Sequence, residues 1–163
     1  MLNAIDFMIK AEEDGLQLYE MLSREAINQE LKDMFALLAD SQKSHLMALQ
    51  TIKSNLSTSE LASMEVKAEL VNGFDKLLNR QNFFQMLRND QDAFWHVVTT
   101  EEEIISTLEG LASNEPHDQM RRVLERVVAD EKEHLNRIEN IYEFMEAPLS
   151  YLAWGEFSNL RPL

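Results

Sequence analysis

The sequence lacks cysteine altogether. This absence excludes disulfide bonds, cysteine-ligated zinc, iron–sulfur clusters and thiol nucleophiles. Glycine and proline are also scarce, with 4 and 3 residues among 163. Because tight turns between strands consume both, and β-branched runs are almost missing, the composition predicts one all-α domain built from long helices.

Basic residues are in short supply as well. Lys and Arg number 15 against 29 Asp and Glu, which gives a formal net charge of −14. A field of this sign repels nucleic acids and anionic membrane surfaces, and it attracts cations. The first residues carry no basic segment followed by an apolar run, and no stretch is apolar enough for a membrane span. We expect no signal peptide and a cytoplasmic location.

Four segments show the apolar spacing of amphipathic helices: residues 3–26, 30–54, 91–112 and 116–145. Pro116 would lie in the first turn of the last segment, where proline is tolerated.

The segments between and after these helices carry their own signals. In the crossover, about residues 55–90, Ser57 and Glu60 have capping-box spacing, which predicts a short helix. Gly73 and residues 79–82 predict an irregular return path. Pro148 is predicted to end the last helix. We expect residues 1–146 to form the bundle, and the aromatic-rich residues 147–163 to form a tail packed on the bundle or on a partner subunit.

The two halves of the chain resemble each other at a shift of 89 residues, the separation of His45 and His134. Among the polar residues that the shift aligns are Glu12 with Glu101, Gln42 with Glu131, and His45 with His134. Two related helical hairpins joined by a long crossover form a four-helix bundle.

Five ionisable residues fall on faces whose spacing is otherwise apolar: Glu12, His45, Glu101, Glu131 and His134. Any one of them alone is better explained as a rim glutamate or a satisfied core histidine. Two pairs of them are level, because the hairpins turn near residues 28 and 117. Glu12 with His45, and Glu101 with His134, then lie about 25 Å from their turns at 1.5 Å per residue.

Carboxylates buried together repel one another and lose their hydration, and bound metal ions remove that cost. Carboxylates and imidazoles are suitable ligands for iron, manganese and zinc. Glu131 and His134, spaced i and i+3, reach the same centre. The sequence therefore predicts a metal centre inside the bundle.

With these residues, the chain resembles the ferritin-like di-iron carboxylate proteins, and most closely their rubrerythrin-like branch. Members carry one Glu on each of two helices and Glu-x-x-His on each of the other two. The matching stretches are EEDGLQLY from Glu12, EEEIISTL from Glu101 and ADEKEHL from Ala129.

The resemblance implies a ferritin-like four-helix bundle that binds two iron ions, with zinc or manganese as substitutes. It implies the ligand set Glu12, Gln42, His45, Glu101, Glu131 and His134. It also implies an oxidoreductase or ferroxidase reaction of iron with dioxygen or peroxide, an external electron donor, and a homodimer.

The sequence departs from the family at two positions. Gln42 replaces a bridging Glu of the second helix, and Ile104 replaces a further carboxylate that accompanies peroxidase chemistry in rubrerythrins proper. A neutral amide does not readily bridge, which predicts a weakened second metal position. The absence of cysteine also leaves no rubredoxin-type domain in this sequence. The alternatives are a non-enzymatic metal-binding or sensor protein with a degenerate site, and a purely structural bundle.

Overall fold

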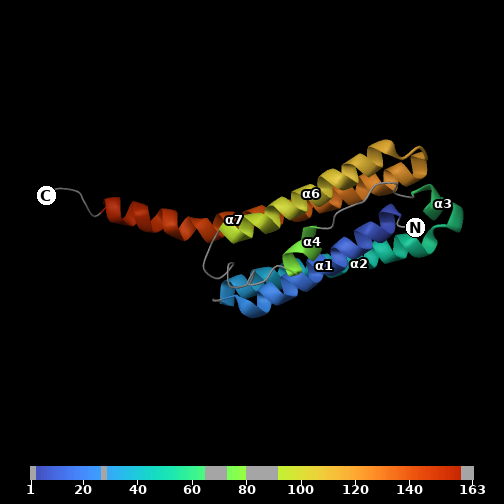
Figure 1. The fold of residues 1–163 in the computed structure, drawn as a ribbon. Helices are drawn as coiled ribbons and strands as arrows, with labels where there is room; N and C mark the ends of the chain where they lie inside the picture. The colour runs from blue at the N-terminus through green and yellow to red at the C-terminus, as the bar shows by residue number, and fades with distance from the viewer. Residues whose placement is uncertain (1–2, 27–28, 65–72, 80–91, 159–163) are drawn as a thin grey trace.

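The computed structural model describes residues 3–26, 29–64, 73–79 and 92–158, and in the last range it describes side chains from 95 to 143. Figure 1 shows that these residues form helices arranged as two long hairpins lying side by side. No strand occurs within the described ranges. The prediction of an all-α bundle is confirmed.

The first hairpin consists of α1 (Ala4–Glu25) and α2 (Gln29–Asn55), and the second of α6 (Asp92–Asn114) and α7 (Asp118–Ser158). Asn3 caps α1, because its side chain accepts a hydrogen bond of 2.8 Å from the Asp6 backbone N–H. Within each hairpin the two helices pack along their length, whereas contacts between the hairpins are far sparser. The four predicted helices are confirmed, apart from some of their ends.

In its described residues, the crossover contains two short helices, α3 (Thr58–Ser63) and α4 (Gly73–Leu78). The capping box predicted for Ser57 and Glu60 is confirmed, and it starts α3. The prediction of an irregular path at Gly73 is wrong, since Gly73 begins α4. A Cβ on Gly73 would lie 2.8 Å from Cγ2 of Thr100, so α4 approaches α6 closely only because this residue has no side chain. Of the predicted return path 79–82, residues 80–82 lie outside the described ranges.

Two predictions about prolines are wrong. Helix α7 begins at Asp118, so Pro116 precedes it instead of lying in its first turn. The helix also continues through Pro148 to Ser158 over 41 residues. An internal proline removes one backbone hydrogen bond, and the turns on both sides supply the others. The predicted packing of the tail 147–163 concerns side chains outside the described ones.

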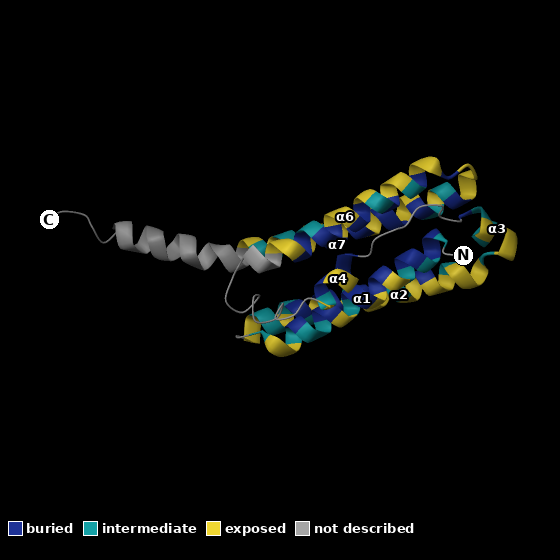
Figure 2. Cartoon of the chain, viewed as in Figure 1, coloured by how far each residue is buried: buried dark blue, intermediate teal, exposed yellow. Residues whose placement is uncertain are grey.

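The core lies between the hairpins, where the buried faces of the helices meet (Figure 2). Its largest fully buried side chains include Ile5, Tyr19, Phe74 and Leu124. Phe74 comes from α4, so the crossover contributes to this core directly. Within the described part of the chain, no helix combines the length and apolar character that a membrane span requires.

Candidate metal centre

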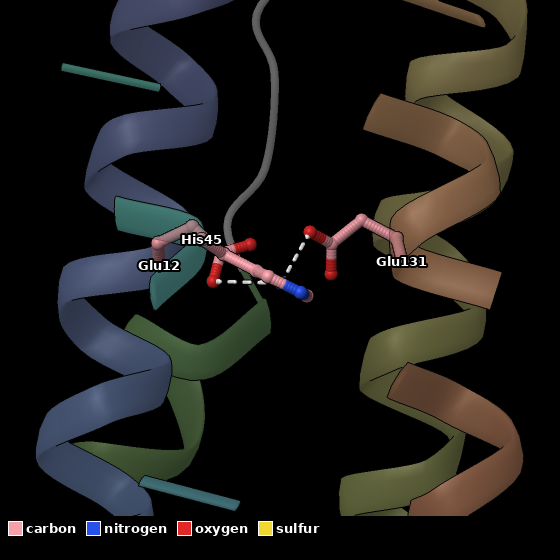
Figure 3. A group of neighbouring side chains, drawn as sticks. All are labelled: Glu12, His45 and Glu131. Atoms are coloured by element: carbon pink, nitrogen blue, oxygen red, sulfur yellow. Dashed lines mark ion pairs between the residues drawn. The ribbon is translucent and has the colours of Figure 1, made fainter. Parts of the chain in front are cut away.

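Glu12 of α1, His45 of α2 and Glu131 of α7 come together between the hairpins (Figure 3). One ligand atom from each lies within 4.8 Å of the others. Nδ1 of His45 is 3.0 Å from Oε1 of Glu131 and 3.9 Å from Oε2 of Glu12. Three residues from three helices thus converge on one point, which is the arrangement a metal ion requires.

Helix periodicity explains why these polar side chains point inward. Glu12 follows the buried Met8 by four residues and precedes the buried Tyr19 by seven, so it lies on the stripe that α1 turns toward the core. Glu131 likewise follows the buried Val127 by four residues. Both carboxylates are held on rigid helices in positions that would ordinarily be apolar.

A second group of contacts lies beside the first. The Tyr19 hydroxyl donates a 2.7 Å hydrogen bond to Oε1 of Glu101, and Nε2 of His134 is 3.5 Å from the same oxygen. The rings of His134 and His45 are 5.4 Å apart between centroids. The two groups are therefore neighbours, and together they contain five of the six residues predicted as ligands.

The sixth, Gln42, is 1% exposed and lies one turn before His45 on α2. Its amide packs against α1 at Gly15, where an added Cβ would lie 2.3 Å from Nε2 of Gln42. Sequence reasoning overlooked Gly15, although an isolated glycine inside a helix pattern commonly marks a close packing contact. The structure therefore places Gln42 inside the core, with its amide against the α1 backbone.

Buried polar atoms without a hydrogen-bond partner are concentrated in this region. Within the described residues they all belong to predicted ligands, namely Glu12 Oε2, Gln42 Oε1, His45 Nδ1, Glu131 Oε2 and both ring nitrogens of His134. A buried polar atom normally has a partner, since leaving it unpaired costs about 1–3 kcal/mol. The chemistry of this donor set, carboxylate and imidazole, fits iron, manganese or zinc.

The polar residues around the centre form a solvated face. Asp130, Lys132 and Glu133 of α7 are exposed, and Lys132 pairs with Glu109. His117 is exposed in the turn before α7, and its Nδ1 lies 2.8 Å from Oε1 of Glu115. His96 is exposed on α6. The other two histidines of the chain therefore lie outside the centre.

Burial and mutual repulsion set the protonation of the centre. Burial raises the pKa of Glu12 well above its ordinary value, and the charge of Glu131 raises it further. Burial also acts to raise the pKa of Glu131, but its contacts with His45 and Glu12 outweigh this and lower it. Burial lowers the pKa of His45, yet Glu131 outweighs it and the pKa is raised overall. Glu12 therefore holds a proton more tightly than Glu131 does.

These shifts predict a pH dependence. A pKa that is raised in the folded state gives stability at low pH that is lost as the pH rises. Glu12 should therefore make the metal-free protein less stable above its ordinary pKa of 4.5, and His45 above its ordinary pKa of 6.5. Metal binding requires deprotonated ligands, so affinity should rise over the same range with proton release. Calorimetric titration with zinc in buffers of different ionisation enthalpy measures the protons released. Binding enthalpies that do not depend on the buffer would contradict this assignment.

The bundle of two hairpins, with carboxylates and histidines converging between them, defines a ferritin-like carboxylate protein. The family model Rubrerythrin matches residues 3–142, which covers all of α1 and α2 and most of α7. The chain belongs to the Rubrerythrin family. Comparison with curated proteins and with solved structures found no match.

Proposed function

We propose that this protein binds iron between its hairpins and supports an oxidoreductase reaction of that iron with dioxygen or peroxide. The proposal rests on the buried polar atoms that have no hydrogen-bond partner. In the described residues, all of these atoms belong to predicted ligands. Membership of the Rubrerythrin family supports the same metal. Buried carboxyl and imidazole groups whose polar atoms lack hydrogen-bond partners destabilise a purely structural core, which argues against a bundle that has no metal role.

The residues divide into two ligand groups in this proposal. Glu12, His45 and Glu131 form the first, and they already converge in the structure. Glu101 and His134 belong to the second, with Gln42 as a neutral oxygen donor in place of a carboxylate. The Tyr19 hydroxyl fixes the orientation of Glu101 through its hydrogen bond. Burial raises the pKa of Tyr19 well above its ordinary value, and Glu101 raises it further, so the hydroxyl stays a donor.

When ferrous iron is bound, it supplies the electrons that reduce the oxidant. The protein side chains do the rest: the carboxylates compensate the metal charge, and the aliphatic core around them excludes water. Glu12, with its raised pKa, can hold or release a proton at the edge of the centre. Restoring the ferrous state needs a reductant from outside, since the chain contains no cysteine for a redox centre of its own. The homodimer and the cytoplasmic location remain predictions.

A second function, metal binding without catalysis, is favoured by one observation. Among the described residues, the first ligand group alone brings together three carboxylate or imidazole side chains. In the second group, the third position is taken by the neutral amide of the buried Gln42. A single tightly held ion would stabilise the fold or report metal supply. Zinc or manganese would serve in that role as well as iron.

Anaerobic loading with ferrous iron followed by mixing with dioxygen distinguishes the two functions. The redox function predicts up to two iron ions per chain and growth of near-ultraviolet absorption from the ferric product in a stopped-flow record. One bound ion with no change in absorption would establish the second function. A metal-free protein as heat-stable as the loaded one would contradict both, because ligands that bind only the folded state raise its stability.

Glu131→Gln and Glu133→Gln provide a matched pair for this measurement. The two residues lie on the same helix, but Glu131 is buried in the centre and Glu133 is exposed. We expect Glu131→Gln to lose iron binding and Glu133→Gln to behave as the wild type. Equal effects of both substitutions would place the iron elsewhere.

A further inference from the structure

A groove opens between α2 and α7 and leads to the metal centre. It encloses about 400 Å³, and His45 and Glu131 are part of its lining. Its buried walls are aliphatic, formed by Leu49 and Val127. Ala48, Thr51, Arg126 and Asp130 are exposed and form the rim. The groove thus connects solvent with the edge of the first ligand group.

The opposite side of the centre is closed. Helix α4 packs against α1 and α6 there. Its Phe74 is buried, lies edge-on to Tyr19 with ring centroids 6.2 Å apart, and contacts the position of Gly15. Glu12 and Glu101 are almost fully buried, whereas the His45 side chain is 20% exposed. Access to the centre through the described residues is therefore from the α2–α7 side.

The lining of the groove favours uncharged molecules. Between the polar rim and the ligands at the inner end, a cation would pass the buried aliphatic walls, which offer no replacement for its water ligands. At the rim, Arg126 and Asp130 carry opposite charges, and neither takes part in an ion pair within the described part of the chain. Their charges offset each other, so this pair adds no net charge at the mouth of the groove. The groove volume of about 400 Å³ also exceeds the roughly 30 Å³ that one water molecule occupies in the liquid, so a small molecule fits inside.

We propose that this groove is the entry route of an uncharged, apolar oxidant, dioxygen or an alkyl hydroperoxide, and that metal ions do not load through it. The inference rests on the proposed function, because it assumes that an oxidant reacts at the centre. It adds the direction of approach, the residues that line the route and the class of molecule admitted. The aliphatic walls take up the apolar molecule and deliver it beside His45 and Glu131.

Ala48→Trp tests the route, because it fills the groove from its exposed rim without altering a ligand. Ala129→Trp is the matched control, since Ala129 is exposed on α7 and does not line the groove. We expect Ala48→Trp to slow oxidation of ferrous-loaded protein by dioxygen and by tert-butyl hydroperoxide by about tenfold, because the close-packed interior formed by the described residues offers no second path of comparable width. In the hydroperoxide assay, two ferrous ions give one electron each, the O–O bond breaks, and two protons are taken up to yield alcohol and water.

Two further measurements do not depend on turnover. Xenon should shift the methyl resonances of Val123 and Val127 in metal-free wild type and in Ala129→Trp, but not in Ala48→Trp, because apolar cavities bind xenon. Anaerobic binding of cobalt(II) should proceed at the same rate in all three proteins. Val123→Phe fills the groove from the opposite helix and repeats the test if Ala48→Trp does not fold.

The outcomes separate the route from the proposed function. If the wild type binds xenon but neither oxidant oxidises its iron, the proposed function is overturned, and an oxidant can no longer be the molecule that enters the groove. A wild type that is oxidised but binds no xenon overturns the route alone. Oxidation at the wild-type rate in a variant whose groove no longer binds xenon overturns the route too. Slower cobalt binding in Ala48→Trp would show that cations also enter here.

Discussion

Replacing Gln42 by glutamate is expected to tighten binding of a second divalent cation by about ten- to a hundredfold. A unit charge about 4 Å away contributes roughly 4 kcal/mol at an effective dielectric constant of 20, and desolvation of the new carboxylate offsets part of it. Gln42 is already fully buried one turn from His45, and Gly15 leaves room for a side chain of the same size. Isothermal titration with iron(II) under anaerobic conditions, or with cobalt(II), measures both affinities.

The same substitution should lower the stability of the metal-free protein, because it adds a fourth carboxylate to a buried site that already holds three. Gln50→Glu is the matched control, since Gln50 is exposed on the same helix. The control should bind metal as the wild type does. Unchanged affinity and stoichiometry in Gln42→Glu would show that position 42 does not face the metal, and the account of the weakened second position would fail.

Replacing Glu12 by leucine is expected to stabilise the metal-free protein by about 1–4 kcal/mol while abolishing metal-dependent stabilisation. Burying a carboxyl next to other carboxylates is unfavourable. Replacing buried ion pairs by apolar residues of similar volume is often neutral or stabilising by about 1–4 kcal/mol, and Glu12→Leu also removes the repulsion from Glu131. The raised pKa of Glu12 has the same cause. Urea denaturation with and without zinc measures both effects in one series.

Glu13→Leu supplies the comparison, because Glu13 is the exposed neighbour of Glu12 on α1. Surface substitutions of this kind usually change stability by less than about 0.5 kcal/mol. Glu13→Leu should therefore keep the zinc-dependent gain of the wild type. A destabilised metal-free Glu12→Leu protein would mean that Glu12 supports the fold, and the metal role of the residue would have to be abandoned.

The long helices could be predicted because their signal is local. Apolar residues recur at helical spacing in each, and the capping box at Ser57 and Glu60 is a contact between residues three apart. The convergence of Glu12, His45 and Glu131 could also be predicted, since antiparallel hairpins place residues at similar distances from their turns on one level. Ligation of metal by the six predicted residues remains a prediction.

The features that sequence reasoning missed depend on contacts between distant segments. Gly73 looks like a helix breaker in the sequence, and only its close approach to Thr100 explains why a glycine stands in this helix. Gly15 likewise owes its place to Gln42 on the neighbouring helix. The groove beside His45 depends on how far α2 and α7 diverge, and the spacing of residues within one helix carries no information about that.

The sparse contact between the hairpins has a consequence for the order of folding. Contacts within each hairpin join residues close in sequence, so the chain loses little entropy in closing each one, and each can form early. Glu12 and His45 lie on the first hairpin and Glu131 on the second, with the crossover between them. The ligand group is therefore assembled only when the hairpins dock, and the carboxylates whose mutual repulsion opposes docking are the predicted metal ligands.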